Sequence, residues 1–188
     1  MPAQDKWMGE MNASIKRVGL LGGSFNPIHY GHTGLAKHIL ETTDIQQIWL
    51  VVSPQNPLKR RKDLMPDEER LKLARQAVAS MPNIKVCDVE MHLPVPSYTV
   101  NTLAVLRQMY PNVDFTLIIG SDNVLCFNKW YNYQEILDKH RVMVYPRPGY
   151  DATELIRTKY PSMVLIDAPQ FNISSTEIRE GRAESSII

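Results

Sequence analysis

Gly22-Gly23-Ser24-Phe25-Asn26-Pro27-Ile28-His29-Tyr30-Gly31-His32 is the stretch that decides the fold of this 188-residue chain. The apolar segment 18–21 runs straight into it, and apolar residues with helical spacing follow it at 35–40. These patterns predict a strand over 16–21, a glycine turn, and a helix from His29 to about Thr42. Glycines allow the backbone to approach a phosphate closely, and a helix N-terminus offers N–H groups and a positive dipole end. The stretch therefore predicts a phosphate-binding turn.

His29 and His32 stand three residues apart, so we expect both on one face of the first helical turn. Histidine is the side chain most easily charged near neutral pH, and two imidazoles there could bind a polyphosphate and stabilise charge developing on it. The stretch is neither a Gly-x-Gly-x-x-Gly fingerprint nor a Walker loop. Two plainer interpretations stay open: a metal pair, which would need further ligands, and a turn with incidental histidines.

The composition indicates a single globular domain without a strong charge field. Hydrophobic residues make up 44%, charged residues 22%, and the formal net charge is +1. The two cysteines, Cys87 and Cys126, indicate a reducing compartment rather than a disulfide framework. The chain has neither an apolar run of ~20 residues nor an apolar signal core, so we expect a cytoplasmic protein. We expect a loose extension over residues 1–15 and one domain over 16–188.

Strand-like apolar runs alternate with helical patterns along the whole chain. Further strands are expected over 45–52, 84–89, 114–119, 141–145 and 163–166, with helices between them. Ser97 is the expected N-cap of one of these helices. The alternation predicts an α/β, Rossmann-like, doubly wound and mostly parallel sheet with helices on both faces.

Ligands of such sheets collect outside the carboxyl ends of the strands, so polar residues at those ends are candidates. Lys59 follows the second strand and could reach a triphosphate, whereas the cations at 60–62 are expected to form a solvated face. Asp122 follows the fourth strand and would either accept hydrogen bonds from ribose hydroxyls or cap a helix. Hydroxyls at 174–176 with Arg179 predict an anion site at a helix start, the alternative being a capped helix with a surface arginine.

Two segments resemble signatures of the adenylyltransferase/cytidylyltransferase superfamily. The first is Gly22–His32, and the second is Ile173-Ser174-Ser175-Thr176-Glu177-Ile178-Arg179, which is similar to Ile-Ser-Ser-Thr-x-Ile-Arg. Over residues 16–179 the chain looks most similar to the bacterial nicotinate mononucleotide adenylyltransferases of NAD biosynthesis. The resemblance implies transfer of the adenylyl group of ATP to nicotinate mononucleotide, giving nicotinate adenine dinucleotide and pyrophosphate.

The resemblance also implies roles for individual residues. His29, His32, Lys59 and Arg179 would be catalytic, the histidines acting on the transferring phosphate. The implied ATP-binding residues are Gly22, Gly23, Ser24, Phe25, Gly120, Asp122, Arg147, Ile173, Ser174, Ser175 and Thr176. The implied acceptor-binding residues are Asn26, Ser97, Tyr98, Thr99, Trp130 and Tyr131, with nicotinate stacked on Trp130 and held by backbone groups. Mg²⁺ would be carried by the ATP phosphates, since no dedicated metal cage is evident in the sequence.

Some alternatives and departures stay open at this stage. The acceptor could be nicotinamide mononucleotide or another phosphorylated compound, and a non-catalytic nucleotide- or RNA-binding module could use the cations at 59–62. Near-neutral net charge and the lack of a second basic cluster count against that module. The lysine loop reads Asn56-Pro57-Leu58-Lys59 rather than the commoner Pro-Pro-His-Lys. Nine residues follow Arg179, where resembled proteins continue through a longer helical tail, so a homo-oligomer is left open.

Overall fold

The computed structural model describes residues 14–54, 64–171 and 174–181, so Lys59, Ile173 and residues 1–13 of the expected extension lie outside the described part. No helix in that part is long and apolar enough to cross a membrane. The elements, with η for 3₁₀ helices, are β1 (Arg17–Gly23), α1 (Tyr30–Thr42), β2 (Gln47–Val52), α2 (Asp67–Val78), β3 (Ile84–Cys87), η3 (Val89–His92), α3 (Thr99–Met109), β4 (Asp114–Gly120), α4 (Ser121–Val124), η4 (Phe127–Lys129), α5 (Tyr133–Lys139), β5 (Val142–Tyr145), α6 (Thr153–Lys159), β6 (Val164–Leu165) and α7 (Ser175–Arg179).

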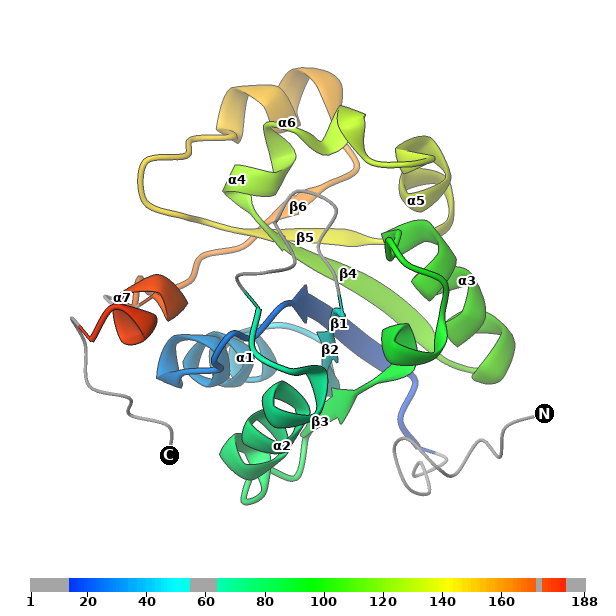
Figure 1. The fold of residues 1–188 in the computed structure, drawn as a ribbon. Helices are drawn as coiled ribbons and strands as arrows, with labels where there is room; N and C mark the ends of the chain where they lie inside the picture. Colours follow the sequence, from blue (N-terminus) through cyan, green and yellow to red (C-terminus); the bar gives the residue numbers. More distant parts are fainter. Residues whose placement is uncertain (1–13, 55–63, 172–173, 182–188) are drawn as a thin grey trace.

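The strands form one six-stranded sheet in the order β3-β2-β1-β4-β5-β6, and every pairing in it is parallel (Figure 1). The chain moves outward from β1 to β3 and then returns to place β4 on the other side of β1. The expected doubly wound α/β sheet is therefore confirmed. The order reverses between β1 and β4, which makes their carboxyl ends the switch point where ligands bind in such sheets.

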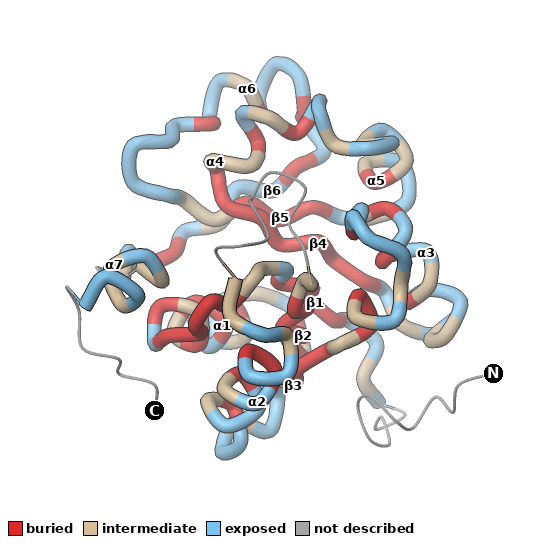
Figure 2. Tube along the Cα trace, in the orientation of Figure 1, coloured by how far each residue is buried: buried red, intermediate tan, exposed pale blue. Residues whose placement is uncertain are grey.

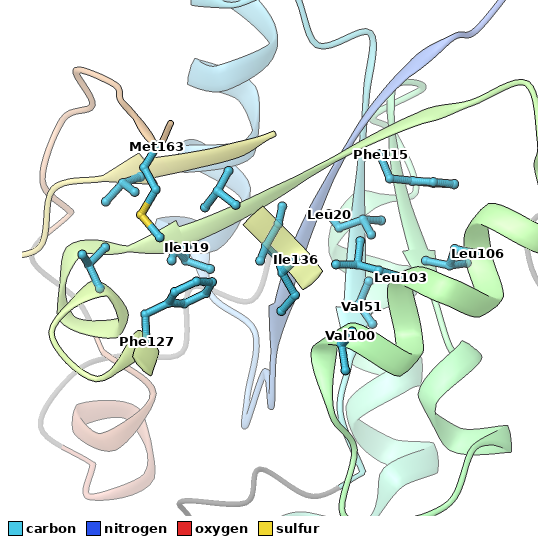
Figure 3. Close-up of a cluster of buried hydrophobic side chains, with 14 of the residues drawn as sticks. Leu20, Val51, Val100, Leu103, Leu106, Phe115, Ile119, Phe127, Ile136 and Met163 are labelled. Carbon is cyan, nitrogen blue, oxygen red and sulfur yellow. The ribbon is translucent and has the colours of Figure 1, made fainter. Parts of the chain in front are cut away.

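Each face of the sheet carries its own apolar core. Leu103 and Leu106 of α3 and Ile136 of α5 pack on one face, in the cluster that also contains Leu20 and Phe115 (Figure 3). Side chains of α1 and α2 pack on the opposite face. The central strands are accordingly buried along most of their length, whereas the helices combine buried residues with exposed ones (Figure 2). Burial on both sides explains why β2 reads as a continuous apolar run.

Several element boundaries differ from the expectations in ways that matter for the site. β1 continues through Gly23, which pairs with Val52 of β2. The third strand ends at Cys87, because the chain turns into η3 from Val89. The expectation that Ser97 caps a helix is wrong: α3 begins at Thr99, Tyr98 is its N-cap residue, and no side chain caps it.

Candidate active site

A cavity of about 360 Å³ opens at the switch point. The ends of β1, β2 and β4 form its floor, while the start of α3 and the segment around η4 form its walls. Its lining residues are Leu20, Gly22, Gly23, Ser24, Val51, Ser53, Glu90, Ser97, Tyr98, Thr99, Thr102, Leu103, Leu117, Ile118, Ile119, Gly120, Asn123, Cys126, Lys129, Trp130, Tyr131 and Tyr145. The cavity thus lies beside the turn that the sequence singled out.

The two histidines of that turn hold each other in place. His29 is the N-cap residue of α1, and its Nδ1 accepts a hydrogen bond from Gly31 N at 3.1 Å. His29 N in turn donates to His32 Nδ1 at 3.1 Å, and the two rings stack with centroids 3.8 Å apart. The rings are neighbours as expected, although His29 precedes the helix rather than lying within its first turn. Because each Nδ1 accepts, the proton of each neutral ring sits on Nε2.

The pKa of His29 is lowered to about 4, chiefly by burial and also by the nearby Arg147 charge, whereas Glu177 opposes the shift. His29 is therefore neutral at pH 7, which corrects the expectation of an easily charged imidazole. A neutral ring with its proton on Nε2 is still a hydrogen-bond donor. A bound anion would favour the imidazolium form, because an opposite charge close by raises the pKa of a histidine.

Arg70 binds backbone carbonyls of the turn and of the segment after β2. It was not among the residues singled out from the sequence. Its guanidinium is fully buried and donates to Ser24 O at 2.7 Å, Ser53 O at 2.8 Å and Met65 O at 3.0 Å. It therefore joins the segments that follow β1 and β2 to the start of α2. The available signal was its position: Arg70 lies four residues before buried Ala74, on the apolar stripe of α2.

The second signature docks on the same turn (Figure 1). Ser175 Oγ donates to Pro27 O at 2.8 Å, and Arg179 Nη1 donates to Asn26 O at 2.5 Å. Ser174 caps α7 by accepting from Glu177 N at 3.2 Å. Two segments about 150 positions apart along the chain are therefore in direct contact, which brings Arg179 to the histidine turn.

The short helix α4, directly after β4, places the carboxylate of Asp122 next to Arg147. Arg147 Nε lies 3.8 Å from Asp122 Oδ1, an atom that is buried and has no hydrogen-bond partner among the described residues. The helix-cap alternative for Asp122 is wrong, because Gly120 is the N-cap residue of α4. A Cβ at Gly120 would lie 2.4 Å from Asp122 Oδ1 and 2.9 Å from Arg147 Cγ, so a larger residue here would displace these two side chains. The carboxylate keeps acceptor capacity for a ligand.

The expected acceptor residues gather in the cavity, with one exception. Ser97, Tyr98, Thr99, Trp130 and Tyr131 all line it. The rings of Tyr98 and Tyr131 lie 5.0 Å apart, and Ser97 Oγ is buried with no hydrogen-bond partner in the described part of the chain.

Two residues of the turn point elsewhere. Asn26 does not line the cavity; it is buried, and its Oδ1 accepts from Met65 N at 2.9 Å. Phe25 is also buried, with a left-handed φ of 44°, and its ring packs edge-on against His32. Its backbone alone could therefore contact ATP.

A second group that the sequence analysis missed is Glu90, in η3. It is buried, lines the cavity, and accepts hydrogen bonds from Ser53 Oγ and from Thr102 Oγ1, the latter at 2.8 Å. In sequence it is an ordinary acidic residue in a loop, so no local pattern reveals its burial.

The described residues contain no group of three or more His, Cys, Asp or Glu side chains arranged to hold a metal ion. Burial raises the pKa of the Cys87 thiol to about 12, which keeps it protonated and unreactive at neutral pH.

Comparisons with known proteins agree on one family. The family model described as cytidylyltransferase-like matches residues 20–181. A Bacteroides fragilis protein named "Probable nicotinate-nucleotide adenylyltransferase" is 45% identical over 169 residues, which cover 89% of this chain and 82% of that protein. A Flavobacterium psychrophilum protein of the same name is 44% identical over 164 residues, 87% of this chain and 85% of that protein. The solved Plasmodium falciparum nicotinic acid mononucleotide adenylyltransferase complexed with NaAD superposes with a TM-score of 0.75 at 25% identity, covering 88% of this chain and 83% of that one.

Proposed function

This chain belongs to the cytidylyltransferase-like family, and from that premise we propose that it is a nicotinate-nucleotide adenylyltransferase of NAD biosynthesis. It transfers the adenylyl group of ATP to nicotinate mononucleotide and releases pyrophosphate. The observation that carries the proposal is the contact between the two signatures: Arg179 and Ser175 bond the histidine turn, next to a cavity lined by Trp130.

The reaction is a displacement at phosphorus. A 5′-phosphate oxygen of nicotinate mononucleotide attacks the α-phosphorus of ATP, and the bond to the bridging oxygen of the β-phosphate breaks as pyrophosphate leaves. Such a transfer depends on positioning and on stabilising charge more than on a protein nucleophile. The neutral Nε2–H groups of His29 and His32 would donate to the transferring phosphate.

Cations on the two sides of the turn would hold the rest of ATP. Arg179 retains donors beyond those it uses on Asn26 O and Thr176 Oγ1, and these would bind the β- and γ-phosphates. Lys59, in the loop between β2 and α2, would act on the same phosphates. Asp122 would accept hydrogen bonds from the ribose of ATP, with Arg147 beside it.

The cavity would hold the acceptor. Trp130 would stack on the pyridine ring, and backbone N–H groups near Thr99 and Tyr131 would bind the nicotinate carboxylate. Ser97 Oγ, buried and without a partner among the described residues, would gain one from the bound mononucleotide.

Mg²⁺ enters the proposal as part of the MgATP substrate, bound to phosphate oxygens. Phosphate oxygens are ligands that suit Mg²⁺, which usually keeps several of its waters. We also place the enzyme in the cytoplasm, since its cysteines Cys87 and Cys126 are both free.

The deciding experiment is pyrophosphate release with MgATP and either nicotinate or nicotinamide mononucleotide. The proposal expects a strong preference for the acid, because backbone donors suit a carboxylate. A preference for the amide would keep the chemistry and overturn the substrate. ATP binding without turnover on either acceptor would instead favour a nucleotide-binding module.

A further inference from the structure

Glu90 is the buried charged residue among the described residues that line the cavity. Its side chain sits between two hydroxyls, Ser53 Oγ and Thr102 Oγ1, each of which donates to a different carboxylate oxygen. Glu90 and both partners line the cavity. Because both of its oxygens accept hydrogen bonds, the carboxylate is held in one orientation.

Among the described residues that line the cavity, the other formally charged side chain is Lys129, which is exposed, so water screens its ammonium group. The buried Arg70 bonds Ser53 O but is not part of the lining, and its guanidinium is paired with Asp67. The rest of the lining is apolar, aromatic or neutral polar. A buried charge in such surroundings acts on a ligand far more strongly than an exposed one does.

We propose that Glu90 selects the positively charged pyridinium ring of the acceptor, a role that rests on the function proposed above. The ring nitrogen of nicotinate mononucleotide is bonded to ribose and therefore carries a full positive charge. The carboxylate attracts this cation across the cavity, and the face of Trp130 attracts it as well. This electrostatic attraction makes the enzyme specific for the oxidised form of the ring.

The proposal predicts that the enzyme distinguishes the oxidised mononucleotide from its reduced form, although the two have similar shapes. Reduction of the mononucleotide gives a 1,4-dihydropyridine, which keeps the carboxylate, ribose and phosphate but has an uncharged ring. Backbone donors to the carboxylate cannot distinguish the two forms, whereas an anion in the wall can. The wild-type protein should therefore prefer the oxidised acceptor.

The test compares kcat/KM for oxidised and reduced nicotinate mononucleotide with MgATP, measured by pyrophosphate release. Glu90→Gln should lower the preference for the oxidised ring roughly 10-fold, because the variant removes the charge while its amide can still bond both hydroxyls. The KM for MgATP should not change. Glu90→Asp, which keeps the charge, should retain the preference, as should Glu154→Gln, a matched change at an exposed glutamate.

An equal loss for both acceptors in Glu90→Gln would overturn the proposal, because it would show that Glu90 only braces the cavity wall. The wild-type protein gives a second test that needs no variant: equal kcat/KM for the two ring forms would also overturn it. A wild-type protein that turns over neither acceptor would refute the proposed function, whereas an active wild type with an unchanged preference in Glu90→Gln would refute this inference alone.

Discussion

The turn after β1 and the cavity beside it are built in opposite ways. Backbone carbonyls of the turn are occupied by side chains from distant segments, with Arg70 on Ser24 O, Arg179 on Asn26 O and Ser175 on Pro27 O. The cavity instead contains a buried hydroxyl, Ser97 Oγ, that has no hydrogen-bond partner among the described residues. The backbone carbonyls of the turn therefore have partners within the protein, whereas the cavity keeps a polar group that the proposed ligand would bind.

This difference separates the effects expected of substitutions. Changes around the turn leave buried polar groups without partners, so they should lower stability as well as activity. Changes in the cavity should alter acceptor affinity and leave stability nearly unchanged. Four predictions test this contrast, beginning with the largest expected effect.

Replacing Arg70 should have the largest effect on folding. Arg70→Met removes donors from three carbonyls and should lower the free energy of unfolding by about 3–5 kcal/mol, measured by urea denaturation. Arg75→Met is the matched control on the same helix: that side chain is 53% exposed and pairs with Asp88, so its loss should cost less than about 1 kcal/mol. Equal costs for the two variants would show that the turn does not depend on its buried anchor.

The second prediction concerns pH and His29. The folded protein holds the pKa of His29 at about 4, against about 6.5 when unfolded, so only the unfolded chain takes up this proton between those values. Stability should therefore fall as the pH drops from 6.5 to 4, by up to about 3 kcal/mol from this group.

Other groups titrate in the same range, so a variant is needed to isolate His29. Burial also lowers the pKa of His140, which adds to the loss of stability. His29→Asn keeps a side chain suited to capping α1 and should give a shallower decline of unfolding free energy with falling pH. Parallel curves for wild type and variant would contradict the burial of an uncharged His29.

The third prediction separates rate from stability within the turn. His32→Ala should lower kcat about 100-fold, because a donor to the transferring phosphate is lost. It should lower the free energy of unfolding by only ~1 kcal/mol, the usual cost of losing a cap interaction. His38→Ala, further along α1, should leave kcat near that of the wild type. Near-normal turnover in His32→Ala would show that His32 does not stabilise the transferring phosphate.

The smallest effect is expected in the cavity. Ser97→Ala should raise the KM for nicotinate mononucleotide about threefold to tenfold, since one hydrogen bond to the ligand is lost. The free energy of unfolding should stay the same or rise, because the removed hydroxyl has no partner in the described protein. Loss of stability together with unchanged KM would break the contrast between cavity and turn.

Local patterns were enough to predict the fold and to single out the turn beside the cavity. The apolar alternation specified the parallel sheet, and the glycine turn before α1 located the histidines, because periodicity and turn chemistry act over a few neighbouring residues. The residues at Ser97–Thr99 and Trp130–Tyr131 were expected in one pocket only because of the family resemblance, and the structure places them around one cavity. The wrong expectation that Ser97 caps α3 shows the limit of such reasoning, because a hydroxyl that precedes a helix can line a cavity instead of capping the helix.

What only the tertiary structure decided concerns burial and long-range contact. Arg70 and Glu90 look like ordinary surface charges in the sequence, and only packing encloses them. The low pKa of His29 likewise depends on burial and on Arg147, and the docking of α7 on the turn joins two ends of the chain. The sequence by itself indicated which residues are candidates for the chemistry and which turn and strand ends many of them adjoin. The folded chain decided their protonation and partners, because desolvation and hydrogen bonding depend on neighbours that are distant in sequence.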